Sequence, residues 1–189
     1  MIASHEPWLL EYIPRSGRTA IDIGSARGVW TYTLAHRFSK VVAFDPIQWI
    51  PVLGVENVEF YNRALWSVSS RILITSYGKA DWTSAVFGYG EYYDSAVPTS
   101  SFWFDAITLD SLGIKDVDFI KIDTEGSEYE VIKGALQTIR KYHPAMVIEI
   151  HKPEFGAAIA SVLPEYSVKK IDHPNPDAKN FWIALNYRG

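Results

Sequence analysis

The chain has 189 residues, of which 48% are hydrophobic and 21% are charged, and its net charge is −4 at pH 7. This composition is typical of one soluble globular domain and gives no support for a basic nucleic-acid-binding surface. The absence of cysteine excludes disulfides and thiolate-bound metals. No apolar run approaches the ~20 residues of a membrane-spanning helix, and the first residues lack a secretory-signal pattern. We therefore expect a cytoplasmic protein.

The N-terminal part predicts a short helix, a strand, a glycine turn and a longer helix. The short helix covers residues 6–12, and the strand over residues 20–23 is apolar apart from Asp22. Gly24 and Gly28 follow, and apolar residues then recur at helical spacing. Glycine suits such a turn because it accepts positive φ angles and lets a ligand approach the backbone.

This turn and its neighbouring acids indicate a site for a nucleoside cofactor. A dinucleotide usually binds at Gly-x-Gly-x-x-Gly, whereas the spacing here is Gly24-x-x-x-Gly28. S-adenosylmethionine carries cationic amino and sulfonium groups, which a carboxylate such as that of Asp22 would favour. The second strand ends at Asp45, which is placed to accept hydrogen bonds from two ribose hydroxyls. An ordinary turn with two capping acids is the alternative.

The region after the second strand is less regular. Residues 58–65 predict a third strand with its turn, which places Asn62, Arg63 and Ala64 near the base of a bound nucleoside, although an ordinary turn is equally consistent. Residues 67–105 then form an aromatic-rich insertion in a single domain spanning residues 1–189.

Within the insertion, residues 71–77 predict a strand. The aromatic side chains of residues 77–104 either cover the sheet or shape a lid or an acceptor pocket.

Regular alternation of strands and helices returns in the second half. Ser127 and Glu130 form the Ser-x-x-Glu pattern of a capping box at the start of a helix. Two consecutive strands at the C-terminus predict an antiparallel hairpin at the sheet edge. The fold class is therefore α/β, with a doubly wound, mostly parallel seven-stranded sheet and one antiparallel strand near the C-terminal edge. The other predicted elements are a helix over residues 29–38, strands over 40–45, 117–123, 145–151, 166–171 and 181–187, and a helix over 154–163.

Five segments occur in the order that one family shows. They are DIGSARGVWT (residues 22–31), VAFDP (42–46), TLD (108–110), FIKIDTEGSE (119–128) and VIEIH (147–151). Together they resemble the FkbM-type S-adenosylmethionine-dependent methyltransferases, which have a Rossmann-like class I methyltransferase fold. The resemblance implies methylation of a hydroxyl on a sugar, glycolipid or other small metabolite. The chain is short for the family and departs from it at Ala26, where Asn is usual, and at Asp45, where Glu is frequent.

The candidate reaction residues lie at the ends of two adjacent strands. Asp123 and Glu125 follow one strand and His151 ends the next, so their side chains should meet at one edge of the sheet. Methyl transfer to a hydroxyl needs alignment of the reactants and a base. We expect His151 to be that base, because an imidazole with a pKa near ~6.5 is largely neutral at pH 7. Asp123 could orient the acceptor, contact the methionine part of the cofactor or act as base itself. Lys121 is expected to face away and to be structural.

The predicted site is therefore the following. The cofactor-binding residues are Asp22, Gly24, Ser25, Gly28, Asp45, Pro46, Arg63, Ala64 and Asp123, and the catalytic residues are His151, Asp123 and Glu125. No metal is assigned, although Asp123, Glu125, Glu149 and His151 could bind a hard cation. The alternatives are a nucleic-acid 2′-O-methyltransferase, a catalytically inactive S-adenosylmethionine-binding module and, more distantly, a nicotinamide-dependent oxidoreductase.

Overall fold

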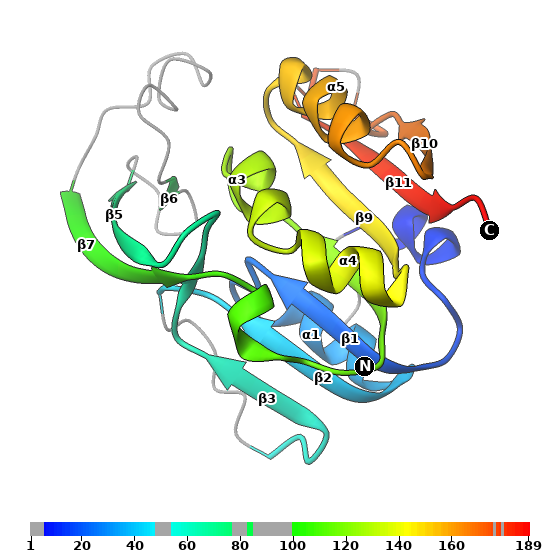
Figure 1. Ribbon diagram of the computed structural model, residues 1–189, viewed down its shortest axis with the longest axis horizontal. Coiled ribbons are helices and arrows are strands. Elements are labelled where there is room, and N and C mark those ends of the chain that lie inside the picture. Colours follow the sequence, from blue (N-terminus) through cyan, green and yellow to red (C-terminus); the bar gives the residue numbers. More distant parts are fainter. Residues whose placement is uncertain (1–5, 48–53, 77–82, 85–99, 176, 179) are drawn as a thin grey trace.

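A seven-stranded sheet forms the centre of the molecule in the computed structural model (Figure 1). The structure describes residues 6–47, 54–76, 83–84, 100–175, 177–178 and 180–189. The strand order is β10-β11-β9-β8-β1-β2-β3, and only β11 runs against its neighbours. The predicted fold class and the antiparallel C-terminal hairpin are confirmed.

Most predicted boundaries agree with the observed elements to within a few residues. The strands of the central sheet are β1 (Gly17–Ile23), β2 (Phe38–Phe44), β3 (Val58–Tyr61), β8 (Val117–Ile122), β9 (Ala145–Ile150), β10 (Tyr166–Ile171) and β11 (Phe181–Tyr187). The helices are η1 (Pro7–Tyr12), α1 (Val29–Ala35), η2 (Asp110–Leu112), α3 (Glu128–Lys133), α4 (Leu136–Tyr142) and α5 (Pro153–Val162).

Helices cover both faces of the sheet, so its inner strands are buried on both sides. Successive residues of β1 show the division, because Ala20 packs in the core beneath η1 and α1, whereas Ile21 packs in the core beneath α3, α4 and α5 (Figure 1). Such double burial explains the nearly continuous apolar runs of the parallel strands. Within the described ranges, no helix is long and apolar enough to span a membrane.

A second, smaller sheet interrupts the alternation of strands and helices. Its order is β4-β7-β5-β6, with β4 at Ala64–Leu65, β5 at Ser70–Ser76, β6 at Thr83–Ser84 and β7 at Ser100–Ile107. The strand predicted over residues 58–65 is therefore divided between the two sheets. Of the predicted aromatic stretch, residues 77–82 and 85–99 lie outside the described residues, so the prediction of a lid there stays a prediction.

Two predicted helices are shorter than the sequence pattern suggests. The first ends at Ala35, and Phe38 belongs instead to β2. The second is divided into α3 and α4, and its predicted capping box does not form. The Ser127 hydroxyl donates to the Thr124 carbonyl, and the Glu130 carboxylate accepts from the Ser67 hydroxyl.

The division between α3 and α4 has a steric cause. A Cβ added at Gly134 would lie 2.0 Å from the carbonyl oxygen of Trp66, which follows β4. The new helix start at α4 is then capped by Asp110, whose carboxylate accepts hydrogen bonds from the backbone N–H groups of Gln137 and Thr138. The break in the helix is thus the place where the small sheet joins the central one.

The Gly134→Ala substitution tests this junction. We expect it to lower the free energy of unfolding by about 1–3 kcal/mol, because the methyl group overlaps a backbone carbonyl that cannot rotate away. Gly156→Ala in α5 is the matched control, since its Cβ would meet no atom closer than 3.7 Å. The control should be neutral or stabilise by up to about 1 kcal/mol. Urea denaturation measures the free energy of unfolding of both variants. Equal effects of the two substitutions would contradict the steric contact at Gly134.

Candidate functional site

A cavity lies at the carboxyl ends of the central parallel strands. The space between its lining residues is about 740 Å³, and this value includes space that is open to solvent. Its lining includes these predicted residues: Gly24, Asp45, Pro46, Arg63, Ala64, Asp123 and Glu125. It does not include Asp22, Ser25, Gly28 or His151. Of these, His151 is buried and contacts the lining residue Glu125.

The glycine turn has the positive φ angles that the sequence predicts, but the need for glycine has a partly different reason. Gly24 and Gly28 both have φ of +75°. A Cβ at Gly24 would lie 1.7 Å from the carbonyl oxygen of Asp123, so glycine is required there by the neighbouring strand end, whatever ligand approaches. Ala26 also has positive φ, and its N–H donates to the Asp45 carboxylate.

The buried ammonium group of Lys121 connects the two strand ends. Its Nζ donates to the Gly24 carbonyl at 2.8 Å and lies 3.3 Å from both Asp22 Oδ1 and Asp123 Oδ2. The prediction that Lys121 faces away was wrong, because residues 121 and 123 have the same strand parity and their side chains lie on the same side. Asp22 is fully buried and also accepts a hydrogen bond from the Thr31 hydroxyl. Its carboxylate is therefore a counterion of Lys121.

These ion pairs set the protonation of the strand ends. Burial alone would lower the pKa of Lys121, but the Asp123 and Asp22 carboxylates raise it above its ordinary value. Burial would likewise raise the pKa of Asp123, but the Lys121 ammonium, a hydrogen bond with Glu149 and the nearby His151 together hold that pKa below its ordinary value. Asp123 is therefore a carboxylate at neutral pH, and a quarter of its side chain is exposed toward the cavity.

Asp45 lines the same cavity, but burial is the main influence on its pKa. Burial raises its pKa to about 6, and hydrogen bonds from the backbone N–H groups of Ala26 and Ile47 only partly oppose this rise. Asn62, a predicted contact to the nucleoside base, donates instead to the carbonyls of Asp45 and Pro46. It therefore fixes the loop that carries the predicted ribose-binding acid.

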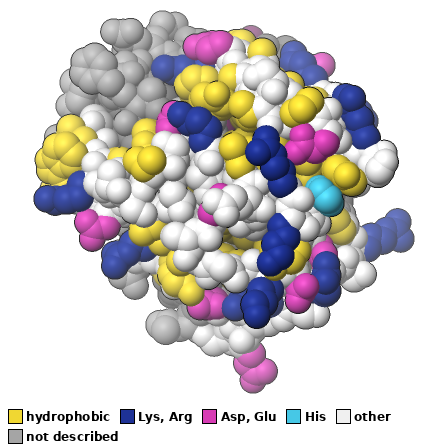
Figure 2. All heavy atoms as spheres, in the orientation of Figure 1, with side chains coloured by type: hydrophobic (Ala, Val, Ile, Leu, Met, Phe, Trp, Pro, Cys, Tyr) yellow, Lys and Arg dark blue, Asp and Glu magenta, His cyan; other side chains and the backbone are white. Residues whose placement is uncertain are grey.

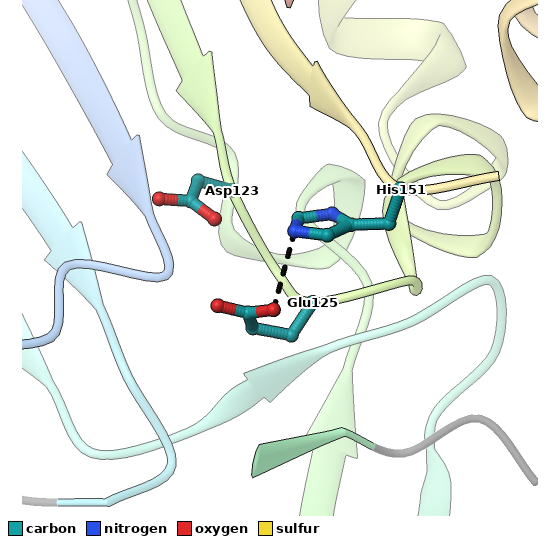
Figure 3. Close-up of side chains that lie close together, drawn as sticks. All are labelled: Asp123, Glu125 and His151. Carbon is teal, nitrogen blue, oxygen red and sulfur yellow. Dashed lines mark ion pairs between the residues drawn. The ribbon is translucent and has the colours of Figure 1, made fainter. Parts of the chain in front are cut away.

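His151 is enclosed by carboxylates and only 1% of its side chain is exposed. Its Nε2 lies 3.2 Å from Glu125 Oε2 (Figure 3). The same nitrogen lies 3.7 Å from Glu149 Oε2, and Nδ1 lies 3.0 Å from Glu128 Oε1. Burial would lower the pKa of His151, but its hydrogen bonds to Glu125 and Glu128 raise it well above the ordinary value. The expectation of a neutral imidazole at pH 7 was therefore wrong.

The backbone helps to bring Glu125 to this cluster. Glu125 has φ of +53°, an unfavourable value for a residue with a side chain, and Gly126 follows with φ of +98°. The N–H of Gly126 donates to the same Glu128 oxygen that contacts His151. Strained backbone of this kind tends to occur at functional sites.

The same cluster offers ligand atoms for a cation. Asp123, Glu125 and His151 each provide one such atom, and these lie within 4.8 Å of one another. A hard cation could be bound by such a set. A protonated imidazole has no lone pair to give a metal, so a cation would first have to displace the proton that the carboxylates hold on His151.

Comparisons with known proteins agree with this arrangement. Residues 22–172 match the methyltransferase FkbM domain family. The chain belongs to this family. The membership supports the prediction that S-adenosylmethionine is the cofactor. Comparison with curated proteins found no similar sequence.

Solved structures show the same fold at low identity. An FkbM methyltransferase from Methylobacillus flagellatus KT is 17% identical, with a TM-score of 0.61 over 93% of this chain and 44% of that one. The chain thus spans less than half of that protein. An rRNA methylase from Streptococcus thermophilus is 14% identical, with a TM-score of 0.55 over 96% of this chain and 93% of that one. A putative methyltransferase from Streptococcus mutans, in complex with SAH, is 13% identical, with a TM-score of 0.50 over the same shares.

Sequence reasoning missed several residues of this FkbM site. The contact between Lys121 and Asp123 could have been predicted, because residues two apart in a strand face the same side. Glu128 lies in the segment FIKIDTEGSE, but no function was assigned to it. Trp66, Ile72 and Ile74 also line the cavity, and they come from the small sheet and its connections. No sequence signal placed that sheet against the strand ends.

Lys121→Met should destabilise the protein by about 3–5 kcal/mol at pH 8, because it leaves two buried carboxylates without their counterion. The loss should be smaller at pH 5, because burial raises the pKa of Asp123 once the Lys121 ammonium is removed and a protonated carboxyl needs no counterion. Lys133→Met is the control, since Lys133 is about one-third exposed, pairs with Glu130 on the helix surface and should cost under about 1 kcal/mol. Similar losses in both variants, measured by urea denaturation, would show that the Lys121 ion pairs contribute little.

The protonation of His151 can be followed by NMR. We expect its imidazole resonance, identified by its loss in His151→Gln, to stay in the protonated position from about pH 6 to pH 8. Glu128→Gln should bring the midpoint down into this range, because it removes one of the acceptors that hold the proton. The pKa of His151 is higher in the folded than in the unfolded protein, so its proton stabilises the folded state. This stabilisation is complete below pH ~6.5 and is lost as the pH rises through the pKa of His151 in the folded protein. A wild-type midpoint near the ordinary value would contradict this description.

Proposed function

We propose that this protein is an S-adenosylmethionine-dependent O-methyltransferase that acts on a hydroxyl of a sugar, glycolipid or other small metabolite. The observation that supports the proposal is the single cavity whose lining joins the glycine turn and Asp45 with the carboxylates of Asp123 and Glu125. One set of residues suits the methyl donor, and the other suits an acceptor that must lose a proton.

The residues of the first set fit the proposed cofactor. Each carboxylate oxygen of Asp45 accepts one backbone N–H, and each retains a lone pair for a ribose hydroxyl. The buried Ser25 hydroxyl, next to the turn, has no hydrogen-bond partner among the described residues. Asp123, from the second set, is partly exposed and would also face the cationic part of the cofactor. When bound, the cofactor supplies an electrophilic methyl group on a sulfonium sulfur.

The residues of the second set can handle the acceptor proton. As the carbon–sulfur bond breaks and the oxygen–carbon bond forms, the hydroxyl proton must pass to a base. We assign this role to Glu125, because it lines the cavity beside Asp123, whose own pKa is held low in part by Lys121. Asp123 would orient the hydroxyl. His151, initially expected to be the base, would act as a positioning residue that holds Glu125 from behind the lining.

The buried Lys121 also bears on the nucleic-acid alternative. A 2′-O-methyltransferase would be expected to use a lysine at the reacting atoms, but Lys121 is only 3% exposed and is engaged by two carboxylates and a carbonyl. The net charge of −4 likewise gives no electrostatic attraction to a phosphate backbone.

Calorimetric titration with S-adenosylmethionine, S-adenosylhomocysteine and NADH tests the cofactor assignment. We expect the two adenosyl compounds to bind and NADH not to bind. Affinity for S-adenosylhomocysteine should rise between pH 5 and pH 7.5 with a midpoint near 6, because ionised Asp45 is the stronger acceptor. Asp45→Ala should weaken binding roughly tenfold or more and remove the pH step. Asp172→Ala, at an exposed site, is the control.

Failure of both adenosyl compounds to bind would overturn the proposed function. A pH step that persists in Asp45→Ala would overturn the role of Asp45 alone. Methyl transfer itself is then tested by release of S-adenosylhomocysteine from a screen of hydroxylated acceptors that begins with sugars.

A further inference from the structure

Exposed apolar side chains gather on the small sheet and its connections. Six large hydrophobic side chains of the described residues are strongly exposed, and four of them, Val68, Leu73, Phe102 and Trp103, lie on β5, on β7 or just before β5. Figure 2 shows hydrophobic side chains at the left edge of the molecule, where Figure 1 places β7. Apolar surface concentrated in this way often marks a place where a ligand or partner binds.

The strand register divides these side chains between two faces. Ile72 pairs with Phe104 and Ile74 pairs with Phe102, so these four side chains share one face. Leu73 pairs with Trp103 on the opposite face, where the Arg71 guanidinium lies over the Trp103 ring. Phe102 and Trp103 are neighbours with similar exposure, 61% and 58%, on opposite sides of one strand.

The face that carries Phe102 is continuous with the cavity. Ile72 and Ile74 are buried and line the same cavity as Asp123 and Glu125. Phe102, directly across from Ile74, extends this apolar wall into solvent. The cavity therefore presents carboxylates from the end of β8 and an apolar surface from β5 and β7.

We propose that the face of β5 and β7 that carries Ile74 and Phe102 is the acceptor subsite, and that the acceptor is an amphiphile with an apolar group next to its hydroxyl. The inference rests on the proposed function. A bare sugar has hydroxyls on every side and would leave some of them unpaired against Ile72 and Ile74, which is costly. An alkyl or aryl group at this wall instead gains by leaving water. Phe102 is thus a specificity-determining residue, and Trp103 is not.

The test compares octyl glucoside, below its micelle concentration, with methyl glucoside, which carries the same hydroxyls without the long apolar tail. Binding of each to the protein saturated with S-adenosylhomocysteine is measured by calorimetry, and methyl transfer is a second readout. We expect octyl glucoside to bind at least tenfold more tightly. Phe102→Ala should reduce this preference about five- to tenfold, whereas the matched control Trp103→Ala should leave it unchanged.

Three outcomes would overturn the inference. The first is equal binding, or no binding, of the two glucosides. The second is an equal effect of the two substitutions. The third is weaker binding of S-adenosylhomocysteine in Phe102→Ala, which would assign this face to the cofactor. Failure of the wild type to bind S-adenosylhomocysteine would instead contradict the proposed function. The two proposals can therefore fail separately.

Discussion

The buried ammonium of Lys121 is the interaction on which the rest of the site depends. It binds Asp22 at the end of β1, the carbonyl of Gly24 in the turn and Asp123 after β8. The ends of two neighbouring strands are thereby fixed relative to each other at the edge where the cavity opens. An apolar side chain of similar length would leave two carboxylates without a counterion in a place where an unpaired charge is very costly.

The same arrangement gives neighbouring carboxylates different basicities. Lys121 lowers the pKa of Asp123, whereas burial raises the pKa of Asp45, and burial together with the nearby Asp123 carboxylate raises that of Glu149. Distinct environments allow groups of one chemical kind to take distinct roles, such as hydrogen-bond acceptor and proton acceptor. The imidazolium of His151 then balances part of the negative charge from behind the lining.

The small sheet complements these charges with an apolar wall. It joins the central sheet where the Trp66 carbonyl approaches Gly134, and its residues Ile72 and Ile74 reach the cavity. The central sheet thus contributes the polar part of the cavity lining, and the small sheet contributes an apolar part.

The sequence by itself determined the elements whose signals are local. The apolar runs of β1, β8 and β9, the glycine turn and the closing hairpin all follow from periodicity and turn residues. The ends of β2 and β8 likewise place Asp45 and Asp123 at one edge of the sheet, where the structure has its cavity.

Only the tertiary structure decided the features that depend on groups distant in the sequence. The helix expected after Ser127 breaks because a carbonyl from the connection after β4 occupies the space of a Cβ at Gly134. His151 is protonated because Glu125, Glu128 and Glu149 converge on it from two segments. Burial and pairing of charges set pKa values, and neither can be derived from the residue types alone until the chain has brought those groups together.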